Sequence, residues 1–186
     1  MFLYRRTGAD LPFGDLLRSH GVSMEGYFWR FTDPESGRVV IALVGINTPR
    51  TGMPWATVGI AVEPERVLAT AVLPDAAADA SGLGVIVGDQ VLADAHRARI
   101  AVGDLSLDVT IEDPRPWPRR LFGGSSYFQM VPGLNQYWHP WLLGGRARGH
   151  VMIEGSRIEL DGWQAYGEKN WGRGGFPDAW WWGQAQ

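Results

Sequence analysis

Hydrophobic and polar residues alternate along much of the chain with the two-residue period of β-strands. Residues 23–32 place aromatic residues and one carboxylate on the same face, namely Glu25, Tyr27, Trp29 and Phe31. Turn-forming residues follow at 33–37, and residues 38–47 are apolar enough for a strand that is buried on both sides. The two segments are therefore predicted to be antiparallel neighbours.

Further strand patterns are separated by turn residues along the rest of the chain. Predicted features are a hairpin of 55–62 with 66–73, a meander over 85–112, a strand at 137–143, and a hairpin of 149–154 with 157–160. Within the meander, residues 105–112 alternate apolar with polar side chains, which predicts a half-buried strand with one wet face.

Glycine and proline limit every other kind of regular structure. The chain contains 25 Gly and 12 Pro, which interrupt it too often for long helices. The Ala-rich segment 74–80 is predicted to be a short helix, with Asp75 as its N-cap. Residues 113–120 contain three prolines and are predicted to lie outside regular structure.

The fold class predicted from these patterns is all-β. About eight to ten short strands with almost no helix indicate a closed or nearly closed antiparallel barrel. A length of 186 residues suits one domain with a sizeable core. We predict an N-terminal arm over residues 1–22 and a single barrel domain over residues 23–186.

Composition and charge exclude several classes of partner and site. The net charge of -3 offers no basic surface for nucleic acid. The chain has no Cys, and His20, His96 and His150 do not show metal-ligand spacing, so no metal site is predicted. Ten Trp residues suggest a large apolar binding surface as well as a core.

Targeting signals and membrane-spanning segments are not evident in the sequence. The first 17 residues are interrupted by Gly, Pro and Asp, unlike a signal peptide, and no apolar stretch reaches the length of a spanning helix. We therefore predict a cytoplasmic protein, with peripheral membrane contact if its substrate is dissolved in the membrane.

The most unusual stretch is residues 165–172, where polar side chains lie within an aromatic segment. In a strand, Glu168 and Asn170 share one face, while Lys169 and Trp171 share the other. Burial of such groups is costly unless they pair with one another or act on a ligand. Local chemistry alone favours a structural pair between Glu168 and Lys169.

Three motifs resemble the tocopherol cyclase-like family. The run YGEKNWGRGGFPDAWWWGQ at 166–184 resembles the family signature, and residues 24–31 are similar to its E-G-W-Y-F-R segment. Residues 127–133, 137–139 and 149–151 are similar to its middle region and occur in the same order. No resemblance is evident between about residues 45 and 120.

The resemblance implies a lipocalin-like (calycin) β-barrel, a fold shared with carotenoid hydratase-like proteins. It also implies cyclisation of a prenylated aromatic or polyene-type hydrophobic substrate, without a cofactor. Relatives commonly contain two such barrels, whereas this sequence ends at Gln186. We therefore expect either a second barrel that is missing here or closure through a partner chain, such as a homodimer.

Alkene protonation requires a neutral acid in a dry site and aromatic faces that stabilise the resulting carbocation. By resemblance Glu168 is the candidate acid, beside Lys169, although Glu25 is equally suitable on sequence evidence. Asn170 or His139 are candidate orienting groups. The candidate substrate-binding residues are aromatic: Tyr27, Trp29, Tyr137, Trp138, Trp171, Phe176, Trp180 and Trp182.

Structural roles are open for each of these residues. His139 is equally consistent with a structural histidine in a strand whose ring nitrogens are hydrogen-bonded. The Trp residues are equally consistent with a core, an interface or a cavity wall. Two other functions use the same barrel: addition of water to a polyene or a pericyclic ring closure, and non-catalytic carriage of a hydrophobic small molecule. A buried acid would favour chemistry over carriage.

Overall fold

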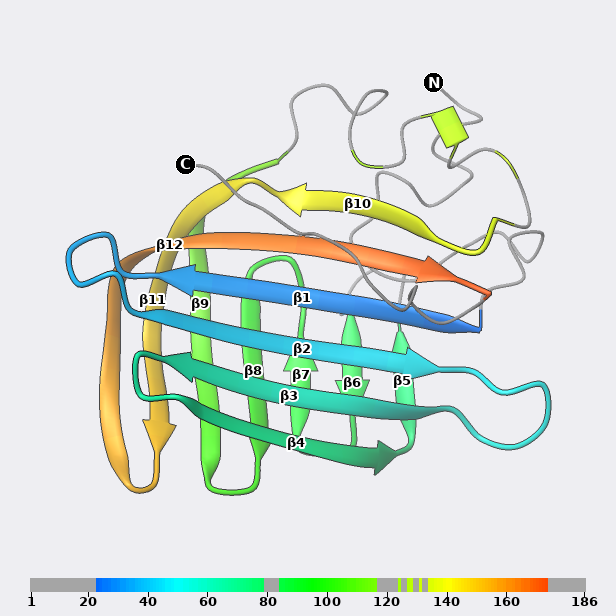
Figure 1. Ribbon diagram of the computed structural model, residues 1–186, viewed down its shortest axis with the longest axis horizontal. Helices are drawn as coiled ribbons and strands as arrows, with labels where there is room; N and C mark the ends of the chain where they lie inside the picture. Colours follow the sequence, from blue (N-terminus) through cyan, green and yellow to red (C-terminus); the bar gives the residue numbers. More distant parts are fainter. Residues whose placement is uncertain are drawn as a thin grey trace.

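The computed structural model describes residues 23–78, 84–116, 124, 127–128, 131 and 134–173. These residues form one antiparallel sheet (Figure 1). Its strands are β1 (Met24–Thr32), β2 (Val39–Asn47), β3 (Trp55–Glu63), β4 (Val67–Pro74), β5 (Ala76–Ala78), β6 (Val85–Val87), β7 (Val91–Ala93), β8 (Arg97–Val102), β9 (Leu105–Arg115), β10 (Tyr137–Leu142), β11 (Gly144–Ile153) and β12 (Ser156–Gly172). The all-β class is confirmed, and the 12 strands exceed the predicted number because three of them contain only three residues.

The sheet is a nearly closed, lipocalin-like barrel made of two halves. Its strand order is β4-β3-β2-β1-β12-β11-β9-β8-β7-β6-β5, with β10 paired to β12 beside this path. In Figure 1, β1–β4 run across the front and β5–β9 run crosswise behind them. The halves pack together through β3 with β8 and β9, and through β4 with β8. The two ends of the sheet, β4 and β5, meet at a corner of the chain at Asp75.

The longest strand, β12, connects the two halves. Its first part pairs with β11, and its last part pairs with β1 on one side and β10 on the other. Figure 1 shows β12 curving from the rear half into the front half. Residues 165–172, the polar and aromatic stretch of the sequence, are therefore held between two neighbouring strands.

Side chains from both halves fill the interior. Alternate residues of β2 and β3 are fully buried, and β9 contributes a similar row. The interior residues of these strands are mainly β-branched or small: Val40, Ala42, Val44, Ala56, Val58, Ile60, Val62, Leu107 and Val109. The pairings predicted from sequence are confirmed for β1 with β2, β3 with β4, and β11 with β12.

The predicted helix at 74–80 is wrong for the residues described. Ala76–Ala78 forms β5 and pairs with β6. Asp75 adopts a φ of 57°, which turns the chain between β4 and β5 where an N-cap was predicted. Tertiary pairing thus overrides the helix propensity of alanine in so short a segment.

The prediction of irregular structure from residue 113 is also wrong at its start, because β9 continues to Arg115. The pairing of β8 with β9 ends at Thr110, so Pro114 lies where β9 pairs only with β11. A missing N–H is tolerated at such an open edge. Asp113, with a φ of 47°, lies beside the register shift between Gly144 and Arg146. Residues 117–120 and the predicted arm at 1–22 lie outside the described residues.

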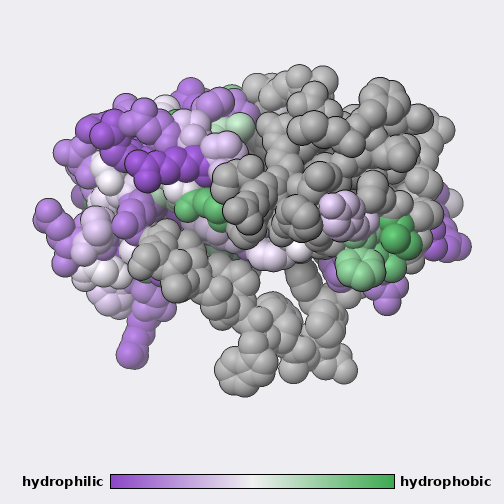
Figure 2. Space-filling model, turned by 90° about the horizontal axis from the view of Figure 1, so that it is seen from above, coloured by the Kyte–Doolittle hydropathy of each residue, from purple (hydrophilic) through white to green (hydrophobic). Residues whose placement is uncertain are grey.

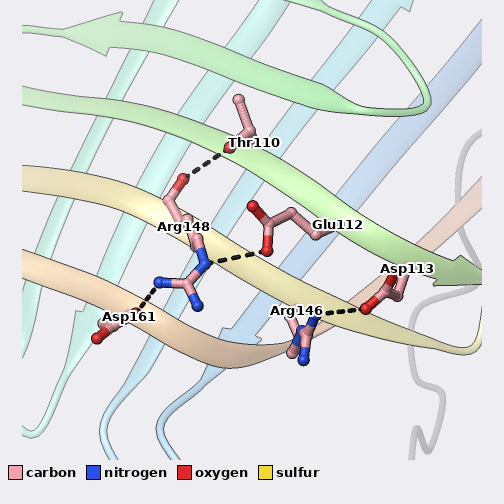
Figure 3. Close-up of polar contacts among 6 residues, drawn as sticks. All are labelled: Thr110, Glu112, Asp113, Arg146, Arg148 and Asp161. Carbon is pink, nitrogen blue, oxygen red and sulfur yellow. Dashed lines mark hydrogen bonds and ion pairs between the residues drawn. The ribbon is translucent and has the colours of Figure 1, made fainter.

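The solvent-exposed face predicted for β9 carries a group of ion pairs (Figure 3). Arg148 of β11 contacts Glu112 of β9 at 3.0 Å and also contacts Asp161 of β12, while Arg146 contacts Asp113. The hydrogen bond with Glu112 is the main cause that raises the pKa of Arg148 above its usual value. In Figure 2, hydrophilic residues (purple) cover much of the left part of the view. Exposed pairs of this kind contribute little individually to stability.

Within the described residues, no helix is long and apolar enough to cross a membrane.

Candidate functional site

The register of β1, β12 and β10 brings predicted site residues from distant parts of the sequence to one interior surface. Glu25 lies opposite Trp171, and Tyr27 lies opposite Lys169. On the other side of β12, Tyr137 lies opposite Trp171 and His139 opposite Lys169. We call these residues, together with Trp29 and Trp141, the interior cluster.

Lys169 is the centre of the interior cluster. Its side chain is 0% exposed, and its Nζ lies 3.5 Å from Oε1 of Glu25, whose side chain is 13% exposed. The same ammonium lies 4.6 Å from the centroid of the Trp171 ring. Removing an ammonium from water costs several kcal/mol, which a carboxylate and an aromatic face offset in part. The carboxylate and the amine are thus held together in surroundings with little water.

Aromatic rings surround this ion pair. Tyr137 stacks on Trp171 with ring centroids 5.5 Å apart. Trp29 contacts Tyr27, and it meets the ring of Trp141 edge to face at 6.4 Å. The Tyr137 hydroxyl donates a hydrogen bond to the carbonyl of Val131, so the same ring fixes the segment that precedes β10. These π faces could stabilise a positive charge that develops beside them.

A glycine makes room for one of these rings. Gly167 lies opposite Trp29 on β1, and the indole of Trp141 lies over it. A Cβ atom built on Gly167 would be 2.8 Å from Cε2 of Trp141, closer than real side chains approach. The glycine of the motif therefore permits the position of Trp141 in the interior cluster.

The opposite face of β12 carries a separate polar pair. The Tyr166 hydroxyl donates a hydrogen bond of 2.6 Å to Oε2 of Glu168, and both side chains are buried. Phe28 of β1 packs edge to face against the Tyr166 ring. Asn170 shares this face and lies over Gly26, whose built Cβ would be 3.1 Å from Cγ of Asn170.

The predicted alternation of faces is therefore confirmed, and it divides the candidate residues. Of the predicted residues, the interior cluster brings together Glu25, Tyr27, Trp29, Tyr137, His139, Lys169 and Trp171. Glu168 and Asn170 lie on the other face, and the ion pair observed for Lys169 is with Glu25. Trp138 is 38% exposed and lies opposite Asn170. Phe176, Trp180 and Trp182 lie outside the described residues.

Trp141 and Tyr166 were not among the predicted site residues. Trp141 follows Tyr137 and His139 at two-residue spacing, so strand alternation could have identified it. Tyr166 precedes Glu168 by two residues on the same strand and could have been found in the same way. The described residues include no group of three or more His, Asp or Glu side chains that could hold a metal ion.

The environment of Tyr166 gives a prediction for alkaline pH. Burial, and then the hydrogen bond and charge of Glu168, raise the pKa of Tyr166 well above its usual value. The folded state therefore keeps this phenol protonated when the unfolded state ionises. The raised pKa of Tyr166 stabilises the folded state fully at pH values below the ordinary tyrosine pKa of about 10. This stabilisation is lost as the pH rises toward the pKa of Tyr166 in the folded state.

We expect ultraviolet titration of the folded protein up to a pH of about 11 to give the same phenolate signal for wild type and Tyr166→Phe. A lower phenolate signal in Tyr166→Phe than in wild type would contradict the protected state of Tyr166.

Comparison with known proteins supports the C-terminal motifs. Residues 117–186 match the model of the family described as tocopherol cyclase-like. The resemblance is thereby confirmed for this part of the chain. The matched range contains β10, β11 and β12, and hence Lys169, Trp171, Tyr137 and His139 of the interior cluster. The N-terminal motif with Glu25 lies outside the matched range.

A structural relative shares the architecture. A protein of Nitrosomonas europaea, to which the name AttH has been provisionally given, superposes with a TM-score of 0.53 at 13% sequence identity. The superposition covers 81% of this chain and 52% of that one, so the chain corresponds to about half the length of this relative. At such low identity the likeness supports the fold alone. No curated protein matches the chain.

Proposed function

We propose that the protein cyclises a prenylated aromatic or polyene-type hydrophobic substrate by protonating an alkene, as the tocopherol cyclase-like name suggests. The observation that carries the proposal is the buried ion pair of Glu25 and Lys169 inside the interior cluster. The match of residues 117–186 to the family model supports the reaction class. A cluster of aromatic residues without ionisable groups would favour a carrier instead.

The pair can supply both proton transfers that such a cyclisation needs. In a dry site, transfer of a proton from Lys169 to Glu25 converts the ion pair into a neutral amine and a carboxylic acid. The acid protonates the alkene and becomes a carboxylate, the phenolic oxygen of the substrate attacks the carbocation, and the amine accepts the phenolic proton. The ion pair is then restored, and no proton is gained or lost overall.

The surroundings of the pair suit a cationic intermediate. The carboxylate that forms on Glu25 attracts the carbocation, and the neutral amine does not repel it at this stage. Trp171 and Trp29 add cation–π attraction, each on the order of 1–2 kcal/mol when water is excluded. His139, in register with Lys169, is the candidate group for orienting the phenol.

The proposal changes the candidate acid from Glu168 to Glu25. Both carboxylates were candidates from sequence, but only Glu25 belongs to the interior cluster with Lys169 and Trp171. Glu168 accepts a hydrogen bond from Tyr166 on the other face of β12. We assign Glu168 a structural role, in which it holds the Tyr166 ring against Phe28.

The experiment is cyclisation of a prenylated hydroquinone in deuterated water, followed by mass spectrometry. Wild-type protein should give a cyclised product that carries one solvent deuteron. Glu25→Gln keeps the shape of the side chain but cannot provide the acid, and it should lower the rate by at least about 100-fold. Glu168→Gln is the matched control on the same pair of strands and should retain most of the activity.

Loss of activity in Glu168→Gln, with activity retained in Glu25→Gln, would overturn the assignment of the acid. Saturable binding of the hydroquinone without product would favour the carrier function. Cyclised product without solvent deuterium would favour a pericyclic reaction on the same barrel. Thermal unfolding of both variants separates loss of chemistry from loss of the fold.

A further inference from the structure

One edge of the sheet lacks the usual protection against pairing with another chain. Strand β4 pairs only with β3 among the described strands, and Figure 1 shows it at the lower margin of the front half. One row of its backbone N–H and C=O groups therefore points away from the sheet. The other end of the sheet, β5, is only three residues long and offers little to pair with.

The sequence of β4 favours pairing. Val67–Pro74 contains no charged residue, pairs with β3 without a bulge, and has a proline only at its last position. Natural edge strands are commonly protected by lysine, by bulges or by central prolines. The outward side chains of Leu68 and Val72 are each 69% exposed. An apolar edge of eight residues is thus available to a partner.

Neighbouring strands extend the apolar surface from this edge. On the same outer face, Leu43 of β2 and Trp55 of β3 are exposed. Leu43 lies opposite Gly59, which in turn lies opposite Thr70 of β4. A strand added to β4 would continue this surface, and apolar surfaces of this kind on sheet edges mark protein contacts.

We propose that two copies of this chain associate through antiparallel pairing of their β4 strands. The strand is self-complementary about Thr70. With the two-fold axis at this residue, Thr70 faces Thr70 of the second copy and Leu68 faces Val72 on the outer side. On the inner side, Val67 faces Leu73. Apart from the Thr70 pair at the axis, apolar side chains then meet apolar side chains from residue 67 to residue 73.

The strand ends bring a positive and a negative residue close together in this register. Arg66 precedes β4 and Asp75 follows it, and both are exposed. Antiparallel pairing centred on Thr70 places Arg66 of each copy opposite Pro74 of the other copy, one residue along the chain from Asp75. Glu65 would face Asp75 directly, but it already forms an ion pair with Arg38 at 2.7 Å. A parallel arrangement would instead bring like charges together at both ends.

The symmetry of this interface gives a specific test with the full chain. In Thr70→Lys, two ammonium groups face each other at the axis, so the dimer dissociation constant should rise at least about tenfold. Thr70→Glu should have the same effect. A mixture of the two variants should associate again, because lysine and glutamate then face each other. Sedimentation equilibrium over a range of concentrations measures each association constant.

Gln164→Lys provides the control, since it adds the same charge at an exposed position on the central strand β12 and should leave association unchanged. Circular dichroism should show the same β structure in every variant. A wild-type protein that stays monomeric at all concentrations would overturn the proposal. Association that survives Thr70→Lys, or that does not return in the mixture, would overturn this interface.

Discussion

Replacing Lys169 with methionine is expected to lower the free energy of unfolding by about 3–5 kcal/mol, because the substitution leaves the Glu25 carboxylate buried without its cation. Methionine matches the length and volume of lysine, so packing against Trp171 is largely kept. The side chain of Lys169 is completely buried, and its ammonium contacts both Glu25 and the Trp171 ring. Urea denaturation monitored by tryptophan fluorescence measures the loss.

A double variant separates charge from packing. Glu25→Gln combined with Lys169→Met removes both charges, and we expect it to recover at least half of the stability lost in Lys169→Met. The exposed pair of Arg157 and Glu159 offers a surface control. Arg157→Met should leave stability nearly unchanged, since exposed ion pairs are screened by solvent.

Equal losses in Lys169→Met and in the double variant would show that the amine contributes through packing rather than through its charge. A Lys169→Met variant as stable as the Arg157→Met control would contradict a desolvated ion pair. Either result would also weaken the proposed chemistry, because the proton transfers depend on a carboxylate and an amine held together away from water.

The sequence was sufficient to predict the division of side chains between the two faces of β12. Strict alternation in a strand separates Lys169 and Trp171 from Glu168 and Asn170, whatever the rest of the fold. Alternation does not reveal which face points inward, because both faces of this strand carry aromatic and ionisable residues. The neighbouring strand β1 shows which face of β12 points inward, since Tyr27 and Trp29 are buried in the interior beside Lys169.

Pairing between distant strands was beyond what the local sequence could predict. Glu25 and Lys169 are far apart in sequence, and only the register of β1 with β12 places them together. The same limit explains β5, where alanines of high helix propensity pair with β6. It also explains Pro114, which is tolerated in β9 because β8 has already ended its pairing. Hairpins were predicted more reliably because turn residues fix them locally.

Replacing Gly167 with alanine is expected to destabilise the protein by about 1–3 kcal/mol, since the added methyl group would overpack the interior cluster. A Cβ atom at this position would lie 2.8 Å from Cε2 and 3.0 Å from Cη2 of Trp141, so the indole must move. Movement of Trp141 also disturbs its edge-to-face contact with Trp29. We therefore expect weaker binding of the prenylated hydroquinone in this variant as well.

Gly59 is the matched control for Gly167, because it also lies within a strand and its added Cβ would make only ordinary contacts, the nearest at 3.4 Å to Leu43. Gly59→Ala should leave stability unchanged or raise it by up to about 1 kcal/mol by restricting the unfolded chain. The double variant Gly167→Ala/Trp141→Phe tests the cause, because phenylalanine lacks the outer ring atoms that meet the new methyl group. If the clash with Trp141 is the origin of the loss, the two substitutions will destabilise the protein by less together than the sum of their separate effects. Strict additivity would instead locate the cost in the backbone of β12.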